Sequence, residues 1–315
     1  MSDKSIAFVF PGQGSQKTGM LAAAHERFAA VRDTFAEASQ ALGYDLWDVV
    51  QNGTQEALNL TETTQPVLLT SSVALWRSWL EQGGRAPQIL AGHSLGEFSA
   101  LVCAGALQFA DAVQLVRQRG AFMQTAVPVG EGAMAAILGL DDDIIDQVCS
   151  AAAVGTGRVV AAVNFNSPGQ VVIAGHTQAV DEAVRLLKDA GAKRAMPLPV
   201  SAPFHTELMR PAGERLAQVI ANLTVRRPEI PVVHNVHAAV ETDPAKIKAL
   251  LVEQIYRPVQ WTRCVQTMAG SGATHIVECG PGKVLSGLSR RIDKSLENFS
   301  LEEPDELLAT LAALS

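Results

Sequence analysis

Short apolar runs alternate with longer amphipathic segments over most of the chain. Four of these runs predict buried strands that end in turns or loops: residues 6–10, 89–91, 231–236 and 275–279. Between them, apolar residues spaced three and four apart predict helices at 21–41, 66–81, 111–125, 206–223, 244–256 and 283–292. Buried strands that alternate with helices are typical of an α/β fold, with helices on both faces of a parallel sheet.

A different pattern occupies residues 130–200. It predicts strand 133–138, helix 141–152, strand 159–164, strand 170–174, helix 177–190 and strand 193–198. This β-α-β-β-α-β order is typical of a ferredoxin-like unit. We therefore expect a discontinuous α/β-hydrolase-like parallel-sheet body, residues 1–126 and 200–315, interrupted by an inserted ferredoxin-like α+β subdomain, residues 127–199. The last twenty or so residues are rich in acidic side chains and predict a polar tail, either helical or frayed.

Composition and charge narrow the class of protein. The chain has 315 residues, 48% of them hydrophobic and 18% charged, which excludes disorder and low-complexity fibres. The 25 basic and 32 acidic residues give a net charge of −7, which argues against broad nucleic-acid binding. The four cysteines form no C-x-x-C pair, and no apolar run has the length of a signal-peptide core or a membrane span. We expect a cytoplasmic protein with neither nucleic acid nor membrane as a partner.

The run Gly92-His93-Ser94-Leu95-Gly96 is the strongest chemical signal. It satisfies G-x-S-x-G after a predicted strand and before a helix-like stretch, the context in which a sharp turn exposes a nucleophilic serine. The following helix N-terminus would add positive potential and a free backbone N–H for an oxyanion. A glycine-rich structural turn is the alternative.

A nucleophilic serine needs a base, and His205 is the best placed of seven histidines. It follows a predicted strand and opens a helix, so its ring would lie at a loop junction. His93 adjoins Ser94 and should point away from it. His234 and His237 lie three apart on a predicted strand, which would place them on opposite faces and argues against a shared metal ion. A structural role for any of these histidines remains an alternative.

Arg119 lies on the apolar stripe of the predicted helix 111–125, whereas Arg117 does not. A buried guanidinium must be paired within the protein or must bind an anion. A snorkelling or internally salt-bridged arginine is one interpretation, and a receptor for a substrate carboxylate is the other. No dinucleotide-binding or P-loop motif occurs in the chain, and no cluster of metal ligands stands out.

Six motifs occur together in an order that resembles the malonyl-CoA:acyl-carrier-protein transacylases. They are Phe10-Pro11-Gly12-Gln13-Gly14-Ser15-Gln16, Gly92-His93-Ser94-Leu95-Gly96-Glu97, Arg119-Gly120 with Met123, Asn164-Phe165-Asn166-Ser167-Pro168-Gly169-Gln170, Pro203-Phe204-His205, and Gln254-Ile255-Tyr256-Arg257-Pro258-Val259-Gln260-Trp261. The resemblance runs from residue 6 to about residue 290. It resembles the free-standing bacterial enzyme of type II fatty acid synthesis more than a domain of a polyketide synthase.

The resemblance implies roles for particular positions. Ser94 would be the acylated nucleophile and His205 its base, oriented by the backbone carbonyl of Gln254. The backbone N–H groups of Gln13 and Leu95 would form the oxyanion hole.

Four further positions would bind the substrate. Arg119 would bind the malonyl carboxylate, with Met123 beside it. Phe204 would discourage a 2-methyl branch on the acyl chain. Asn166 belongs to a motif on the subdomain side of the cleft, without a defined role.

The implied reaction transfers a malonyl group from malonyl-CoA to the phosphopantetheine thiol of acyl carrier protein, in two steps through a malonyl-serine. No cofactor is implied, because the coenzyme A thioester is a substrate and the partner carries the phosphopantetheine. Since the carrier protein is acidic, a local basic patch should bind it, and the candidates are Lys193, Arg194, Lys283, Arg290 and Arg291. We expect a monomer. The alternatives are a serine esterase or thioesterase, and a non-catalytic acyl-CoA-binding protein.

Overall fold

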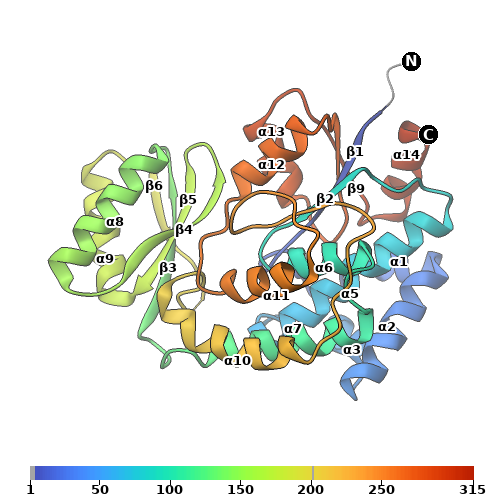
Figure 1. Ribbon diagram of the computed structural model, residues 1–315, viewed down its shortest axis with the longest axis horizontal. Helices are drawn as coiled ribbons and strands as arrows, with labels where there is room; N and C mark the ends of the chain where they lie inside the picture. Colours follow the sequence, from blue (N-terminus) through green and yellow to red (C-terminus); the bar gives the residue numbers. More distant parts are fainter. Residues whose placement is uncertain (1–3, 201) are drawn as a thin grey trace.

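Five parallel strands form the central sheet of the larger part of the molecule (Figure 1). The computed structural model describes residues 4–200 and 202–315. The strands lie in the order β7 (Val232–Val233), β2 (Ile89–Gly92), β1 (Ile6–Phe10), β8 (His275–Glu278) and β9 (Glu297–Ser300). Every neighbouring pair is parallel. The predicted parallel sheet is therefore present, with an additional strand, β9.

Helices cover both faces of this sheet, as the buried strands predict. Phe8 and Phe10 of β1 pack with the helices of one face, and Ala7 and Val9 pack with Trp261 and its neighbours on the other. The helices of the body are α1 (Ala22–Arg27), α2 (Ala29–Leu42), α3 (Leu46–Asn52), α4 (Gln55–Leu58), α5 (Thr61–Glu81), α6 (Gly96–Cys103), α7 (Phe109–Gln124), α10 (Arg210–Ala221), α11 (Pro244–Glu253), α12 (Trp261–Gly270), α13 (Val284–Ile292) and α14 (Pro304–Leu314), with a 3-10 turn at Glu207–Met209.

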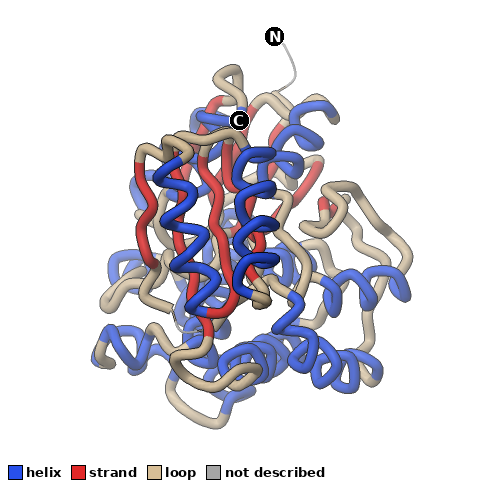
Figure 2. Tube along the Cα trace, turned by 90° about the vertical axis from the view of Figure 1, so that its left-hand side faces the viewer, coloured by secondary structure: helices blue, strands red, loops and turns tan. Residues whose placement is uncertain are grey.

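The second sheet has four antiparallel strands. Their order is β4 (Val160–Ser167), β5 (Gln170–His176), β3 (Gly132–Leu138) and β6 (Arg194–Pro197). Helices α8 (Asp142–Thr156) and α9 (Thr177–Asp189) lie across one face of this sheet (Figure 2). The β-α-β-β-α-β order that the sequence predicts is confirmed.

Three predicted elements of the body differ from the structure. The single helix 21–41 is wrong, because Phe28 adopts extended backbone (φ −112°) and separates α1 from α2. The helix expected to begin at Pro66 begins at Thr61, so the proline lies inside it. The strand 231–236 ends after Val233, since the backbone N–H of Asn235 donates to the Glu97 side chain. For the acidic tail, the helical alternative is confirmed by α14, although β9 precedes it and Leu307 and Leu314 of the helix are buried.

The parallel register brings several loops to one edge of the sheet. Residue Leu90 of β2 is paired with Val232 of β7, so the residues that follow the two strands lie side by side. The loop that follows β1 reaches the same edge. In open α/β sheets, ligands bind at this carboxyl edge. Within residues 4–200 and 202–315, no helix is both long and apolar enough to cross a membrane.

Candidate active site

Ser94 lies on a tight turn between β2 and α6, the strand–turn–helix context that the motif predicts. Its φ angle of 49° is in the left-handed region, which residues other than glycine seldom adopt. The two flanking glycines allow this close path. A Cβ on Gly92 would lie 1.9 Å from the carbonyl carbon of Gly96, and a Cβ on Gly96 would lie 2.0 Å from the carbonyl oxygen of Phe10. Only glycine fits either position, and the turn presents the serine hydroxyl at the sheet edge.

His205 faces this hydroxyl from the segment that precedes α10. The Nε2 atom of His205 lies 2.9 Å from Ser94 Oγ, and its Nδ1 atom lies 2.7 Å from the backbone carbonyl oxygen of Gln254. A carbonyl oxygen only accepts hydrogen bonds, so Nδ1 carries the ring proton and Nε2 is left to accept the proton of Ser94. The geometry is that of a nucleophile, a base and an orienting group.

Burial and charge keep this base neutral. Desolvation, with a further contribution from the nearby Arg119 cation, lowers the pKa of His205 to about 3. Burial lowers the pKa of Arg119 to about 10, so its guanidinium is still protonated at pH 7. The site therefore holds a neutral base and a cation side by side.

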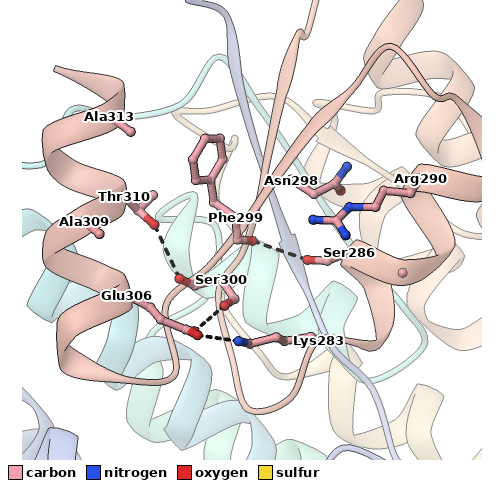
Figure 3. Close-up of a pocket in the computed structure, with 11 residues that line it drawn as sticks. Lys283, Ser286, Arg290, Asn298, Phe299, Ser300, Glu306, Ala309, Thr310 and Ala313 are labelled. Carbon is pink, nitrogen blue, oxygen red and sulfur yellow. Dashed lines mark hydrogen bonds and ion pairs between the residues drawn. The ribbon is translucent and has the colours of Figure 1, made fainter.

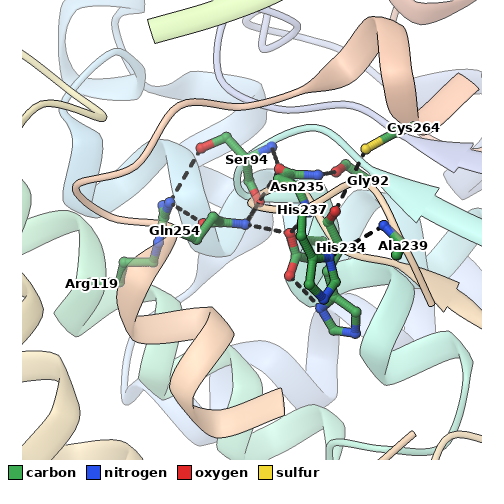
Figure 4. Close-up of polar contacts among 10 residues, drawn as sticks. Gly92, Ser94, Arg119, His234, Asn235, His237, Ala239, Gln254 and Cys264 are labelled. Carbon is green, nitrogen blue, oxygen red and sulfur yellow. Dashed lines mark hydrogen bonds and ion pairs between the residues drawn. The ribbon is translucent and has the colours of Figure 1, made fainter. Parts of the chain in front are cut away.

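Arg119 is only 1% exposed and approaches the nucleophile directly (Figure 4). Its guanidinium donates to Gln65 Oε1 and Gln254 Oε1, each at 2.8 Å, and to Ser94 Oγ at 3.2 Å. Its ring contact is Phe98, at 5.2 Å from the centroid. Among the described residues no carboxylate forms an ion pair with Arg119, so the internal salt bridge considered above is absent.

A cavity of about 110 Å³ opens beside these groups. Seven of the nine candidate residues line it: Gln13, Ser94, Leu95, Arg119, Met123, Phe204 and His205. The backbone N–H groups of Gln13 and Leu95 have no hydrogen-bond acceptor within the part of the chain that the structure describes. Both are therefore available to a ligand in the cavity.

The other two candidates lie just outside the lining. Gln254 contributes its backbone carbonyl to His205 and its side chain to Arg119. Asn166 Oδ1 lies 2.8 Å from Nε2 of His93, whose ring lines the cavity. Asn164, two residues before Asn166, also lines it. The only sequence feature that could have identified Asn164 as a site residue is its place in the same motif as Asn166.

Sequence reasoning missed the buried polar residues behind the nucleophile. Glu97, Asn235 and Gln65 are each at most 1% exposed, and all three bond to groups of the site. Glu97 ends the nucleophile motif, and this position was the only local signal. The expectation that His234 and His237 lie on opposite faces of a strand is wrong, because the strand ends at Val233. His234 directly follows it, His237 lies in the next turn, and the two ring centroids are 6.0 Å apart. In the described ranges, no group of three or more His, Cys, Asp or Glu side chains is arranged to hold a metal ion.

A second, larger hollow of about 520 Å³ lies between α13, β9 and α14 (Figure 3). Its polar groups largely satisfy one another. Ser300 Oγ donates to Glu306 at 2.6 Å, Lys283 pairs with the same carboxylate, and Ser286 Oγ donates to the carbonyl of Phe299 at 3.3 Å. The described residues that line it include no serine–histidine pair, whereas Ser94 and His205 line the smaller cavity.

A serine held by a neutral base, beside free N–H donors, is the arrangement of an acyl-transferring enzyme. The acyl transferase domain family matches residues 7–303 of the chain. A malonyl CoA-acyl carrier protein transacylase of Salmonella typhimurium is 58% identical over 97% of this chain and 98% of its own length. The chain belongs to the family of malonyl CoA-acyl carrier protein transacylases.

Solved structures agree with this assignment. The malonyl CoA-acyl carrier protein transacylase from Coxiella burnetii superposes with a TM-score of 0.97 at 48% identity, covering 99% of this chain and 98% of that one. A malonyl-transacylase in complex with its type II polyketide synthase acyl-carrier protein superposes with a TM-score of 0.97 at 50% identity, covering 98% of this chain and 100% of that one.

Proposed function

We propose that the protein moves a malonyl group from malonyl-CoA to the phosphopantetheine thiol of acyl carrier protein in fatty acid biosynthesis. The observation that carries the proposal is the position of Arg119. Its buried guanidinium lies 3.2 Å from Ser94 Oγ and has no carboxylate partner in the described chain. A charge held in this way suits an acyl chain that ends in a carboxylate.

The first half of the reaction forms a malonyl-serine. His205 Nε2 takes the proton of Ser94 Oγ as the oxygen attacks the thioester carbonyl carbon. The carbonyl oxygen becomes an oxyanion that the backbone N–H groups of Gln13 and Leu95 stabilise. When the intermediate collapses, the carbon–sulfur bond breaks, and His205 gives its proton to the coenzyme A thiolate. Meanwhile Arg119 holds the malonyl carboxylate.

The second half repeats these steps with the carrier thiol as the nucleophile. His205 accepts the thiol proton, the sulfur attacks the malonyl-serine carbonyl, and the same N–H donors stabilise the oxyanion. Collapse breaks the bond to Ser94 Oγ, which takes the carrier-thiol proton from His205. The serine proton leaves on coenzyme A and the carrier-thiol proton replaces it, so Ser94 and His205 regain their starting protonation states. Because coenzyme A leaves before the carrier thiol reacts with the malonyl-serine, we expect ping-pong kinetics without a cofactor.

The proposed function is tested by intact-mass measurement of protein incubated with malonyl-CoA. The wild type should gain one malonyl group and lose it on addition of acyl carrier protein, while Ser94→Ala should gain none. Steady release of free malonate without carrier protein would indicate a thioesterase instead. Binding of malonyl-CoA without any mass gain would indicate a non-catalytic acyl-CoA-binding protein.

We further propose that the chain folds into two parts that together form the site. The strand order β4-β5-β3-β6, with two helices on one face, supports a ferredoxin-like subdomain, and we place it at residues 127–199. The parallel sheet with a serine turn after β2 supports an α/β-hydrolase-like catalytic domain at 1–126 and 200–315. Leu198 of the subdomain and Phe204 of the catalytic domain both line the cavity, so the two parts would share the site. We further propose a cytoplasmic monomer.

We propose a basic rim of exposed residues, Lys193, Arg194, Arg290 and Arg291, as the docking site for the acidic carrier protein. Arg291 donates to Gln170 Oε1 at 2.7 Å. Gln170 is in register with Leu138, and Leu138 with Arg194, which places Arg194 two strand spacings, about 10 Å, from Gln170. Lys283 is paired with Glu306 and contributes less free charge.

Charge reversal tests this rim. The double variant Arg290→Glu/Arg291→Glu should slow transfer to the carrier protein and reduce the salt dependence of that step. The matched control is Arg226→Glu/Arg227→Glu, an exposed basic pair that lies outside the rim. Equal effects of the two double variants would remove the assignment.

A further inference from the structure

We propose that Asn235 is the positioning residue of the nucleophile. Its carboxamide bridges the two backbone groups on either side of His93, holds Ser94 in its left-handed conformation, and leaves the Leu95 N–H to the oxyanion. This inference rests on the proposed transfer through Ser94.

The bridge consists of two short hydrogen bonds (Figure 4). The backbone N–H of Ser94 donates to Asn235 Oδ1 at 2.7 Å, and Asn235 Nδ2 donates to the carbonyl oxygen of Gly92 at 2.7 Å. A carboxamide presents one acceptor and one donor in fixed geometry, so it replaces the strand partner that these two groups lack after β2 ends. Removing it would leave the buried Gly92 carbonyl and the partly buried Ser94 N–H without these partners.

The parallel register explains why a residue so distant in sequence reaches the turn. Val232 and Val233 of β7 pair with Leu90 and Ala91 of β2. Continuing this register places Asn235 beside the turn that carries Ser94. There its own N–H donates to Glu97 Oε2 at 2.9 Å, so its backbone is fixed as well as its side chain.

The consequence concerns which N–H groups serve the reaction. Because Asn235 Oδ1 occupies the N–H of Ser94, that donor is not available to the oxyanion. The N–H of Leu95, which has no acceptor in the described chain, lines the cavity instead. Asn235 thereby fixes both the direction of Oγ and the identity of the oxyanion donor, without touching the substrate.

The experiment compares Asn235→Ala and Asn235→Asp with the wild type in acylation by malonyl-CoA. In Asn235→Ala, misplacement of the nucleophile should lower kcat about 10²-fold, with KM within about threefold. Folding is followed by thermal unfolding. The matched control is Asn298→Ala, which removes an Nδ2 donor to the carbonyl of Leu296 (2.8 Å) far from Ser94 and should leave kcat unchanged.

The Asn235→Asp variant separates positioning from a general loss of structure. Its carboxyl group, when protonated, can still donate to the Gly92 carbonyl and accept from Ser94, whereas the ionised form repels that carbonyl. The activity of this variant relative to wild type should therefore rise at least tenfold between pH 8.5 and pH 5.5. The side chains that contact Asn235 are those of Glu97, Gln254 and Cys264. The other charged or titratable groups nearby are one contact further away: Arg119 donates to Gln254 and Ser94, and His234 and His237 lie in the segment that contains Asn235.

Any of three results would overturn the inference. The first is a kcat for Asn235→Ala within threefold of wild type in a folded protein. The second is a pH-independent activity ratio for Asn235→Asp. The third is a loss of kcat that Asn298→Ala reproduces. A wild type that never forms malonyl-serine would refute the proposed function itself, and this outcome is distinct from both.

Discussion

Replacing Arg119 by alanine should change which acyl group the protein transfers. The guanidinium is buried, protonated at pH 7, and held by two neutral amides, so a malonyl carboxylate would meet a full charge in a partly dry cavity. Two unit charges about 4 Å apart interact by about 4 kcal/mol at an effective dielectric constant of about 20. Since each 1.4 kcal/mol is a factor of about ten, the loss should be about 10³-fold in kcat/KM for malonyl-CoA.

The assay compares malonyl-CoA with acetyl-CoA at equal enzyme concentration. Acetyl transfer has no carboxylate to lose, so its kcat/KM should stay within about threefold or rise. Arg117→Ala is the matched control, because Arg117 lies on the same helix, is exposed, and contacts the Tyr44 ring, 5.4 Å from its centroid. An equal fall with both substrates would refute the reasoning and assign Arg119 to activation of Ser94, which it contacts at 3.2 Å.

The remaining predictions concern the base, the turn and the acyl pocket. Because burial lowers the pKa of His205 to about 3, kcat/KM for acylation should be flat on the acid side down to about pH 4; an acid limb near pH 6.5 would contradict this. Because the pKa of His205 is lower in the folded than in the unfolded protein, its contribution to stability is complete above pH 6.5 and is lost as the pH falls towards 3. Over that range the midpoint of thermal unfolding should therefore fall less steeply in His205→Asn than in the wild type. Gly96→Ala should lower stability by more than about 2 kcal/mol in denaturant titration, because its Cβ would lie 2.0 Å from the Phe10 carbonyl oxygen; Gly155→Ala, with open space around its Cβ, is the control. Phe204→Ala should raise the ratio of methylmalonyl to malonyl transfer in competition assays, and an unchanged ratio would remove Phe204 from substrate selection.

The parts of the site that sequence could predict are those encoded locally. The turn around Ser94 is specified by its two glycines, and the loop position of His205 by the element boundaries beside it. Arg119 was visible because a charge on an apolar stripe contradicts the pattern of its own helix. The orienting role of Gln254 comes from its backbone carbonyl, which any residue possesses, so only the resemblance identified that position.

The contacts of the site that could not be predicted depend on the order of strands in the sheet. Glu97 and Asn235 meet because β7 lies beside β2, and no local pattern in the chain encodes that neighbour relation. The prediction of a strand at 231–236 was wrong for the same reason, because it depended on contacts with a neighbouring strand. Asn235 turns its N–H to Glu97 in place of a ladder partner, so a sequence typical of a strand gives way to a turn. Tertiary hydrogen bonds there outweigh local β-propensity.

The backbone of the site carries strain that its polar network must offset. Four non-glycine residues in the described chain have positive φ, and two of them are Ser94, the proposed nucleophile, and His205, its hydrogen-bond partner. Such conformations cost about 1–3 kcal/mol each and persist only where the surroundings fix them. Here the fixing groups are neutral: Asn235 holds Ser94, and the backbone of Ile255 accepts from the His205 N–H at 3.2 Å. A charged clamp at either position would shift the pKa of the base, so neutral amides suit a site that keeps the charge of Arg119 for the substrate.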